Sequence, residues 1–132
     1  MESILKGLGL RATPQRLAIL KLLEGNITHP SAEELYNSIK PNFPSLSLTT
    51  VYNTLESLSG AGVIQEIGID SERRRFDPNP KPHNHFLCNK CRKVFDLNVY
   101  LLSFSLPQQV GEFWVEGAAV HFFGLCSKCV SD

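Results

Sequence analysis

The chain has 132 residues, a length that fits one ordinary domain or two small ones. Hydrophobic residues make up 42% and charged residues 20%, which is typical of a soluble globular protein. No apolar run approaches the roughly 18 residues that span a bilayer, and no signal-peptide segment is recognisable, so we expect a cytoplasmic protein with no membrane partner. The 13 basic and 13 acidic residues balance, which argues against a non-specific polyanion binder. A local basic surface for DNA remains compatible with this balance.

Three amphipathic segments with capping residues predict helices in the first half of the chain. The first runs from Thr13 to Gly25, with Thr13 as the cap and a proline at the first helical position. The second runs from Ser31 to about Lys40 and opens with a capping box. The third runs from Leu48 to Gly60 behind the cap Ser47.

Two short strands should follow the helices, at Val63–Ile67 and Arg74–Asp77, around a polar tip at Asp70–Glu72. Three helices followed by a β-hairpin is the order of a winged helix-turn-helix domain. The third helix would be its recognition helix, because its polar face suits base edges and thymine methyl groups. A generic three-helix core with a solvated polar face is the alternative that the pattern leaves open.

Basic residues on the first helix and on the hairpin are expected to contact phosphates. The residues expected to contact DNA are Arg11, Arg16, Thr49, Thr50, Tyr52, Asn53, Arg73 and Arg74, with Lys21 and Arg75 as further phosphate contacts.

Alternating prolines at Pro78, Pro80 and Pro82 favour a semi-rigid polyproline II spacer. We therefore expect a DNA-binding domain at 1–77, a hinge at 78–82 and a second domain at 83–132. In the second domain we expect strands at Asn84–Leu87 and Lys93–Asp96, a helical segment near Val99–Ser105 and one long strand from Phe113 to Leu125. A domain this small needs a bound metal or another cross-link for stability. Its apolar strand edge predicts dimerisation.

The four cysteines form two CxxC pairs, Cys88/Cys91 and Cys126/Cys129. Two such pairs are typical of one closed tetrahedral zinc site with a structural role. The gap between the pairs is longer than in a standard zinc ribbon, so two free dithiols are the alternative.

A second metal site is indicated by His83 and His85, which project to one face of an extended strand. Asp77 and Asp96 are nearby hard donors, whereas a histidine placed like His29, taken alone, is more often an ordinary loop residue. A nitrogen and oxygen ligand set suits Fe(II), Mn(II) or Zn(II). His121, on the expected long strand, is interpreted as a packed or surface histidine.

Five motifs together span nearly the whole chain. They are Leu10–Arg16, His29–Tyr36, Leu48–Leu55, His83-x-His85-x-x-Cys88-x-x-Cys91 and Gly124-Leu125-Cys126-x-x-Cys129. In this order they resemble the Fur superfamily of metalloregulators. The resemblance implies an α+β protein with an N-terminal winged helix and a small C-terminal α/β dimerisation domain that carries the four-cysteine zinc site. It also implies a homodimeric, metal-responsive repressor that binds double-stranded operator DNA.

Within the family the chain is most similar to PerR-type peroxide sensors, because Asp96 and Asn53 match that branch. The family's regulatory shell maps onto His29, Asp77, His83, His85 and Asp96, which would bind Fe2+ or Mn2+. Hydrogen peroxide would oxidise His29 and His83 in a metal-catalysed reaction, and this oxidation would release the DNA. We expect no other small molecule to act on the protein. An iron- or zinc-responsive uptake regulator of the same family is the alternative.

Some residues depart from the family pattern. Pro82 and Ala118 stand where many members have a further ligating histidine, and Arg92 stands where a glycine is common. Outside the family, a zinc hydrolase is the rival interpretation, but the chain lacks an HExxH or similar motif, so we expect no enzyme. A zinc-stapled interaction module without DNA binding is the third possibility.

Overall fold

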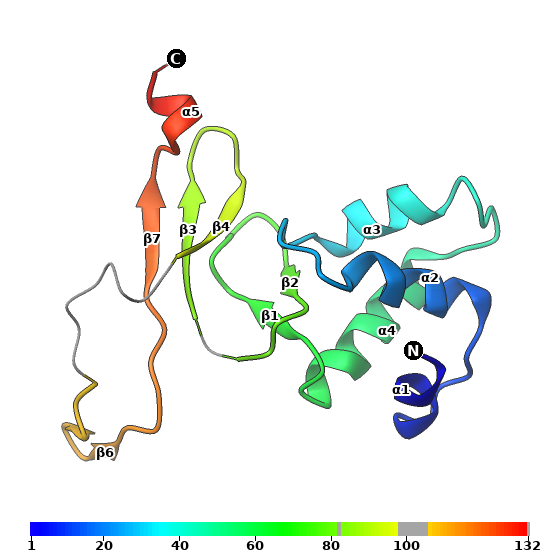
Figure 1. The fold of residues 1–132 in the computed structure, drawn as a ribbon, viewed down its shortest axis with the longest axis horizontal. Coiled ribbons are helices and arrows are strands. Elements are labelled where there is room, and N and C mark those ends of the chain that lie inside the picture. Colours follow the sequence, from blue (N-terminus) through cyan, green and yellow to red (C-terminus); the bar gives the residue numbers. More distant parts are fainter. Residues whose placement is uncertain (82, 98–105, 132) are drawn as a thin grey trace. The chain divides into compact units, whose positions relative to one another are not determined.

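A computed structural model describes residues 1–81, 83–97 and 106–131 (Figure 1). Pro82 and the helix expected near Val99–Ser105 lie outside the described residues. The chain divides into two compact units, Met1–Pro80 and Lys81–Asp132. In the described part of the chain, the helices are all too short or too polar to cross a membrane.

The first unit begins with four helices, α1 (Glu2–Gly7), α2 (Pro14–Leu23), α3 (Ala32–Ile39) and α4 (Leu48–Gly60). The three longer ones confirm the sequence prediction, and each begins at its expected cap. The Thr13, Ser31 and Ser47 hydroxyls accept backbone N–H bonds at 3.2, 3.2 and 3.1 Å. Helix α1 was not predicted, because it has no side-chain cap.

A two-stranded antiparallel wing follows, made of β1 (Gln65–Ile67) and β2 (Arg75–Asp77). Its register places Gln65 opposite Asp77. With α2, α3 and α4 it completes the predicted winged helix-turn-helix. The expected polar tip is only partly solvated, because Asp70 is buried.

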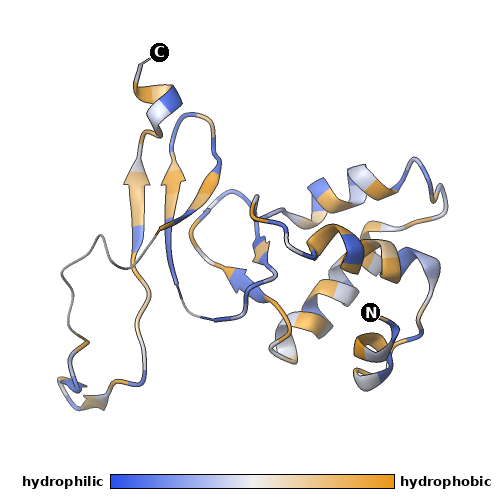
Figure 2. Cartoon of the chain, viewed as in Figure 1, coloured by the Kyte–Doolittle hydropathy of each residue, from blue (hydrophilic) through white to orange (hydrophobic). Residues whose placement is uncertain are grey.

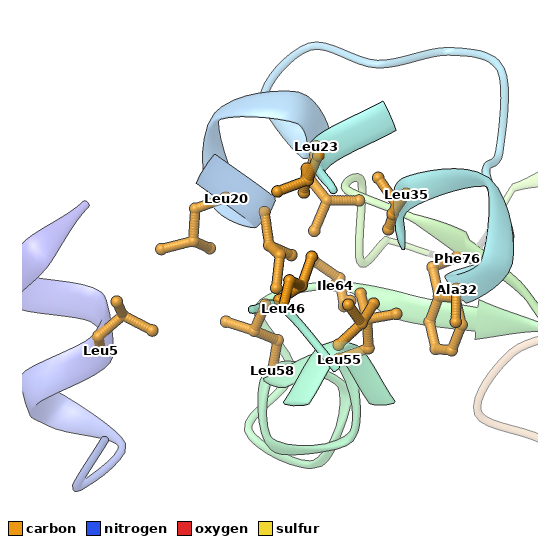
Figure 3. Close-up of a cluster of buried hydrophobic side chains, with 13 residues drawn as sticks. Leu5, Leu20, Leu23, Ala32, Leu35, Leu46, Leu55, Leu58, Ile64 and Phe76 are labelled. Carbon is orange, nitrogen blue, oxygen red and sulfur yellow. The ribbon is translucent and has the colours of Figure 1, made fainter. Parts of the chain in front are cut away.

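The core of the first unit lies among the helices and strand β2. Leucines from α1, α2, α3 and α4 converge there with Ile64 and with Phe76 of β2 (Figure 3). Burial of these apolar faces stabilises the unit at about 25 cal/mol per Å2. Since Phe76 is fully buried, the wing is part of the core rather than an appendage.

The second unit contains a three-stranded sheet of order β4–β3–β7, made of β3 (Asn84–Cys88), β4 (Val94–Leu97) and β7 (His121–Gly124). Strand β3 pairs antiparallel with β4 and parallel with β7. The chain is therefore α+β, as predicted, with a winged helix followed by a smaller unit that ends in the short helix α5 (Ser127–Val130).

The prediction of one long strand from Phe113 to Leu125 is wrong. Strand β6 (Phe113–Trp114) forms a small hairpin with β5 (Gln109–Val110), whereas β7 pairs with β3. The two ends of the segment have different hydrogen-bond partners, so residues between them leave the extended sheet. An apolar run alone does not reveal such a change of partner.

The turn after the first CxxC gives a physical reason for the glycine that the family resemblance would place at position 92. Arg92 has φ of +64°, in the left-handed region that disfavours residues with a Cβ atom. Its backbone N–H donates to the Cys88 carbonyl at 2.9 Å, which closes the turn.

We expect Arg92→Gly to raise the free energy of unfolding by about 0.5–1 kcal/mol, because relief of the left-handed strain outweighs the added unfolded-state entropy. Thermal unfolding of the zinc-loaded protein measures this. Lys93→Gly is the matched control, since Lys93 lacks a positive φ and should lose stability. Equal destabilisation by both changes would contradict the account.

Candidate metal centres and nucleic-acid interface

The four cysteines gather at one end of the sheet in the second unit. Cys88 ends β3, Cys91 lies in the following turn, and Cys126 and Cys129 flank or belong to α5. Their sulfur atoms all lie within 4.8 Å of one another, and Cys91 Sγ is 3.9 Å from Cys126 Sγ. Zinc–sulfur bonds of about 2.3 Å in a tetrahedron require sulfurs roughly 3.8 Å apart. The arrangement fits a closed structural zinc site.

Backbone N–H groups around Cys88 favour its thiolate form. The N–H of Cys91 donates to Cys88 Sγ at 3.5 Å and that of Cys126 at 3.4 Å. The hydrogen bond from Cys91, followed by that from Cys126, lowers the pKa of the Cys88 thiol to about 6. Since thiolate is the form that binds zinc, the backbone prepares Cys88 for metal.

In the first unit, His29 and Asp77 form a buried pair. His29 lies before α3 and Asp77 ends β2, and His29 Nε2 is 3.3 Å from Asp77 Oδ2. Both side chains are almost completely buried. Asp77 Oδ1 also accepts the backbone N–H of Asn79 at 2.9 Å, which fixes the carboxylate. An imidazole nitrogen and a carboxylate oxygen so placed form part of a donor set that suits Fe(II), Mn(II) or Zn(II).

In the second unit, one carboxylate oxygen contacts two imidazoles. Asp96 Oδ1 lies 2.9 Å from His83 Nε2 and 3.3 Å from His85 Nε2. His85 and Asp96 are directly opposite in the β3–β4 pair. His83 Nδ1 is 2.7 Å from the Lys81 carbonyl, which can only accept, so Nδ1 carries the proton. With Nδ1 protonated, Nε2 is the ring nitrogen left to face Asp96 or a metal.

His121 lies beside this group, a neighbour that sequence reasoning missed. It is opposite His85 in the parallel β3–β7 pair, with ring centroids 5.7 Å apart. Burial and then the charge of His85 lower the pKa of His121. Only the parallel register brings these histidines together, and the sequence gives no local signal for it.

The polar face of α4 differs in accessibility along its length. Thr49 and Asn53 are exposed, whereas Thr50 and Tyr52 are partly buried. The Tyr52 hydroxyl donates to Glu33 Oε1 at 2.5 Å. This bond lowers the pKa of the Glu33 carboxyl and raises that of the Tyr52 phenol. Tyr52 therefore offers its ring, more than its hydroxyl proton, to a ligand.

The exposed arginines of the wing are paired with carboxylates. Arg73 Nη1 contacts Glu34 at 3.0 Å, and Arg74 contacts Glu66 at 2.6 Å and Glu56 at 3.2 Å. Such exposed pairs are weak, so phosphates can compete for both arginines.

The other basic residues that were expected to contact phosphates lie on or before α2, apart from Arg75. Arg11 and Lys21 are exposed, and partly buried Arg16 donates to the Arg11 carbonyl at 3.0 Å. Arg75 is only 4% exposed, so its expected phosphate contact is wrong. Its guanidinium is used inside the unit, bound to Asp70 at 3.0 Å.

Comparison with known proteins defines the family. The model of the ferric uptake regulator family matches residues 7–112. The chain belongs to this family.

Individual relatives refine the comparison. The chain is 37% identical to the peroxide-responsive repressor PerR of Staphylococcus saprophyticus over 127 residues, covering 95% of this chain and 86% of that protein. The chain is 32% identical in sequence to the Campylobacter jejuni peroxide stress regulator. The crystal structure of that protein matches with a TM-score of 0.68, over 98% of each chain. The Helicobacter pylori ferric uptake regulator Fur, at 22% identity, shares the fold with a TM-score of 0.75, over 99% of this chain and 89% of that one.

We expect Cys88→Ser to lose zinc and unfold the second unit, because zinc binding in so small a unit supplies folding free energy. Metal analysis and far-UV circular dichroism measure both effects. Ser127→Ala, a change beside the cysteines at a residue that is not a ligand, should keep zinc. A folded, zinc-free Cys88→Ser protein would refute the structural assignment.

Proposed function

We propose that this protein is a cytoplasmic, metal-dependent transcriptional repressor that binds operator DNA as a homodimer and releases it when hydrogen peroxide appears. The observation that carries the proposal is the carboxylate of Asp96 shared by His83 and His85, in a nitrogen and oxygen group separate from the four thiols. Similarity to peroxide-responsive repressors supports the choice of signal.

The proposed regulatory metal is Fe2+ or Mn2+, and its ligands come from both units. His29 and Asp77 would be supplied by the first unit, and His83, His85 and Asp96 by the second. Each group already has its donor atoms close together within its own unit, which supports the assignment. Three imidazoles and two carboxylates suit these ions and leave out the thiolates that zinc prefers.

Such a metal would tie the DNA-binding domain, 1–77, to the dimerisation domain, 83–132, across the hinge at 78–82. Two recognition helices in a dimer must match half-sites about one helical turn apart. Fixing the domains would hold that spacing, and metal and DNA would therefore favour each other's binding. The DNA-contacting residues would be Arg11, Arg16, Thr49, Thr50, Tyr52, Asn53, Arg73 and Arg74.

A second copy of the chain is the proposed partner of exposed apolar side chains on the second unit. Phe113 and Trp114 are 74% and 71% exposed, and Phe123 of β7 is 59% exposed. Hydrophobic ribbon lies in β6 and, beyond a hydrophilic start, in the upper part of β7 (Figure 2). Exposed large apolar side chains of this kind are typical of interaction sites, which supports dimerisation through this unit.

Peroxide would act on the ligands themselves. Ferrous iron, when bound, would catalyse cleavage of the O–O bond of hydrogen peroxide without being consumed in the net reaction. One oxygen atom would add to ring C2 of His29 or His83, whose hydrogen would move to a ring nitrogen to give 2-oxo-histidine, and the other oxygen would leave as water. The ring loses two electrons and the peroxide gains two. The oxidised ring binds metal poorly, so the domains separate and the DNA is released.

The four thiols are not the proposed sensor. A closed zinc shell leaves no exposed, low-pKa thiolate of the kind that peroxide oxidises. An iron- or zinc-responsive regulator would share the fold and the DNA site. It would differ in keeping its DNA when peroxide is added.

We expect Asp77→Ala, His85→Ala and Asp96→Ala to abolish Mn2+-activated operator binding while zinc stays bound, because the two ligand sets share no residue. Gel-shift titration with Mn2+, together with zinc analysis, tests this. Glu112→Ala, which removes an exposed carboxylate outside both sets, is the control. Zinc loss in the three ligand variants would show that the two sites are not independent.

Brief exposure of the Fe2+-loaded protein to peroxide should add one oxygen atom to the peptides that contain His29 or His83. Operator DNA should be released in parallel, whereas Mn2+-loaded protein should stay bound and unmodified. Peptide mass spectrometry and fluorescence anisotropy follow the two events. Release with oxygen found only on cysteines would refute the mechanism, and retention of DNA would favour the metal-uptake alternative.

A further inference from the structure

A buried charge network in the first unit, made by Arg75 and Asp70, lies next to His29. Arg75 Nε donates to Asp70 Oδ2 at 3.0 Å, and Arg75 Nη1 donates to the backbone carbonyl of His29 at 3.1 Å. The Arg75 and Asp70 side chains are 5% and 0% exposed. Glu34 approaches the same guanidinium at 3.7 Å from the exposed side.

The backbone at His29 is in a conformation that needs support. His29 has φ of +55°, a left-handed conformation that residues with a Cβ atom rarely adopt. The loop is also joined to β2 by a backbone bridge between Ser31 and Arg75, in which the Phe76 N–H donates to the Pro30 carbonyl at 3.0 Å. The Arg75 side chain and the backbone of β2 therefore both hold this short loop in place.

The same strand carries Asp77. Arg75 and Asp77 are two residues apart on β2, so their side chains project to one face, and Phe76 projects to the other, into the core. On their shared face, Arg75 holds the His29 carbonyl and Asp77 meets the His29 ring at 3.3 Å. The backbone and the ring of His29 are thus fixed by one strand.

A buried ion pair gives little stability by itself, because desolvation offsets its attraction, and a well-packed apolar pair is often as stable. An apolar pair has no donor for the His29 carbonyl. The guanidinium, with several donors in a fixed fork, can bind Asp70 and that carbonyl together, which a lysine cannot reproduce in the same geometry.

We propose that Arg75, oriented by Asp70, is a positioning residue for the regulatory metal site, which holds His29 in its left-handed conformation so that the ring faces Asp77. This inference rests on the proposed function. It concerns a residue that raises the affinity of the regulatory site for its metal without contacting the metal. Arg73 and Arg74 are proposed DNA contacts and directly precede β2. Strand β2 therefore also links these DNA contacts to the metal ligands. Operator binding and metal affinity are then coupled through β2.

The test is the Mn2+ affinity of the zinc-loaded full-length protein, measured by the electron paramagnetic resonance signal of free Mn2+. Arg75→Lys keeps the charge and loses the fork, and should weaken Mn2+ binding about 10–100-fold, the usual effect of losing a group that orients a ligand. The apolar pair Arg75→Met with Asp70→Leu should have the same effect. Circular dichroism checks that this double variant is folded.

Lys6→Arg is the control for a conservative change of a basic residue, because Lys6 is exposed on α1 and outside the proposed metal and DNA contacts, and it should leave Mn2+ affinity unchanged. Wild-type Mn2+ affinity in folded Arg75→Lys protein would overturn the proposal, whether or not the apolar pair folds. Asp96→Ala in the same assay distinguishes failure of the proposed metal site from failure of the positioning role of Arg75. If Asp96→Ala weakens Mn2+ binding and the Arg75 variants do not, only the positioning role is refuted. If Asp96→Ala binds Mn2+ like the wild type, the proposed metal site is refuted.

Discussion

Burial of strand β2 is the constraint on which the first unit depends. All three of its residues are buried, although two of them are charged. Phe76 faces the helices and closes the core, while Arg75 and Asp77 face the loop that carries His29. One short strand therefore fixes the wing, the core and two proposed metal ligands, and a shift of β2 would disturb all three.

Strand β3 has a comparable role in the second unit. His85 lies near its start and Cys88 at its end, so one strand carries a proposed ligand of each metal. The N–H of Asn89, just beyond β3, donates to the Gly124 carbonyl at 2.7 Å and so holds the ends of β3 and β7 together beside the cysteines. Zinc at the cysteines would strengthen this junction and support the nitrogen and oxygen donors along the same strand. The thiolate ligands and the nitrogen and oxygen ligands would then be chemically separate but connected through strand β3.

Local signals in the sequence were enough to predict much of the fold. Thr13, Ser31 and Ser47 predict their helices because a side-chain cap acts within one turn. Features that depend on distant partners were missed. The break between β6 and β7 comes from pairing with different strands, and the burial of Arg75 comes from Asp70 and the His29 loop. The cysteine pairs could be read from spacing, whereas the grouping of His29 with Asp77 needed the family resemblance.

The central claim is that one metal ion, bound by ligands from both units, fixes their relative orientation. Single-molecule energy transfer between dyes on exposed Asn42 and Gln108, introduced as unnatural amino acids to spare the cysteines, measures it directly. We predict a broad distance distribution in the zinc-only protein that narrows to one peak with Mn2+, and that stays broad in Asp77→Ala. The same distribution with and without Mn2+, or narrowing that persists in Asp77→Ala, would contradict the account.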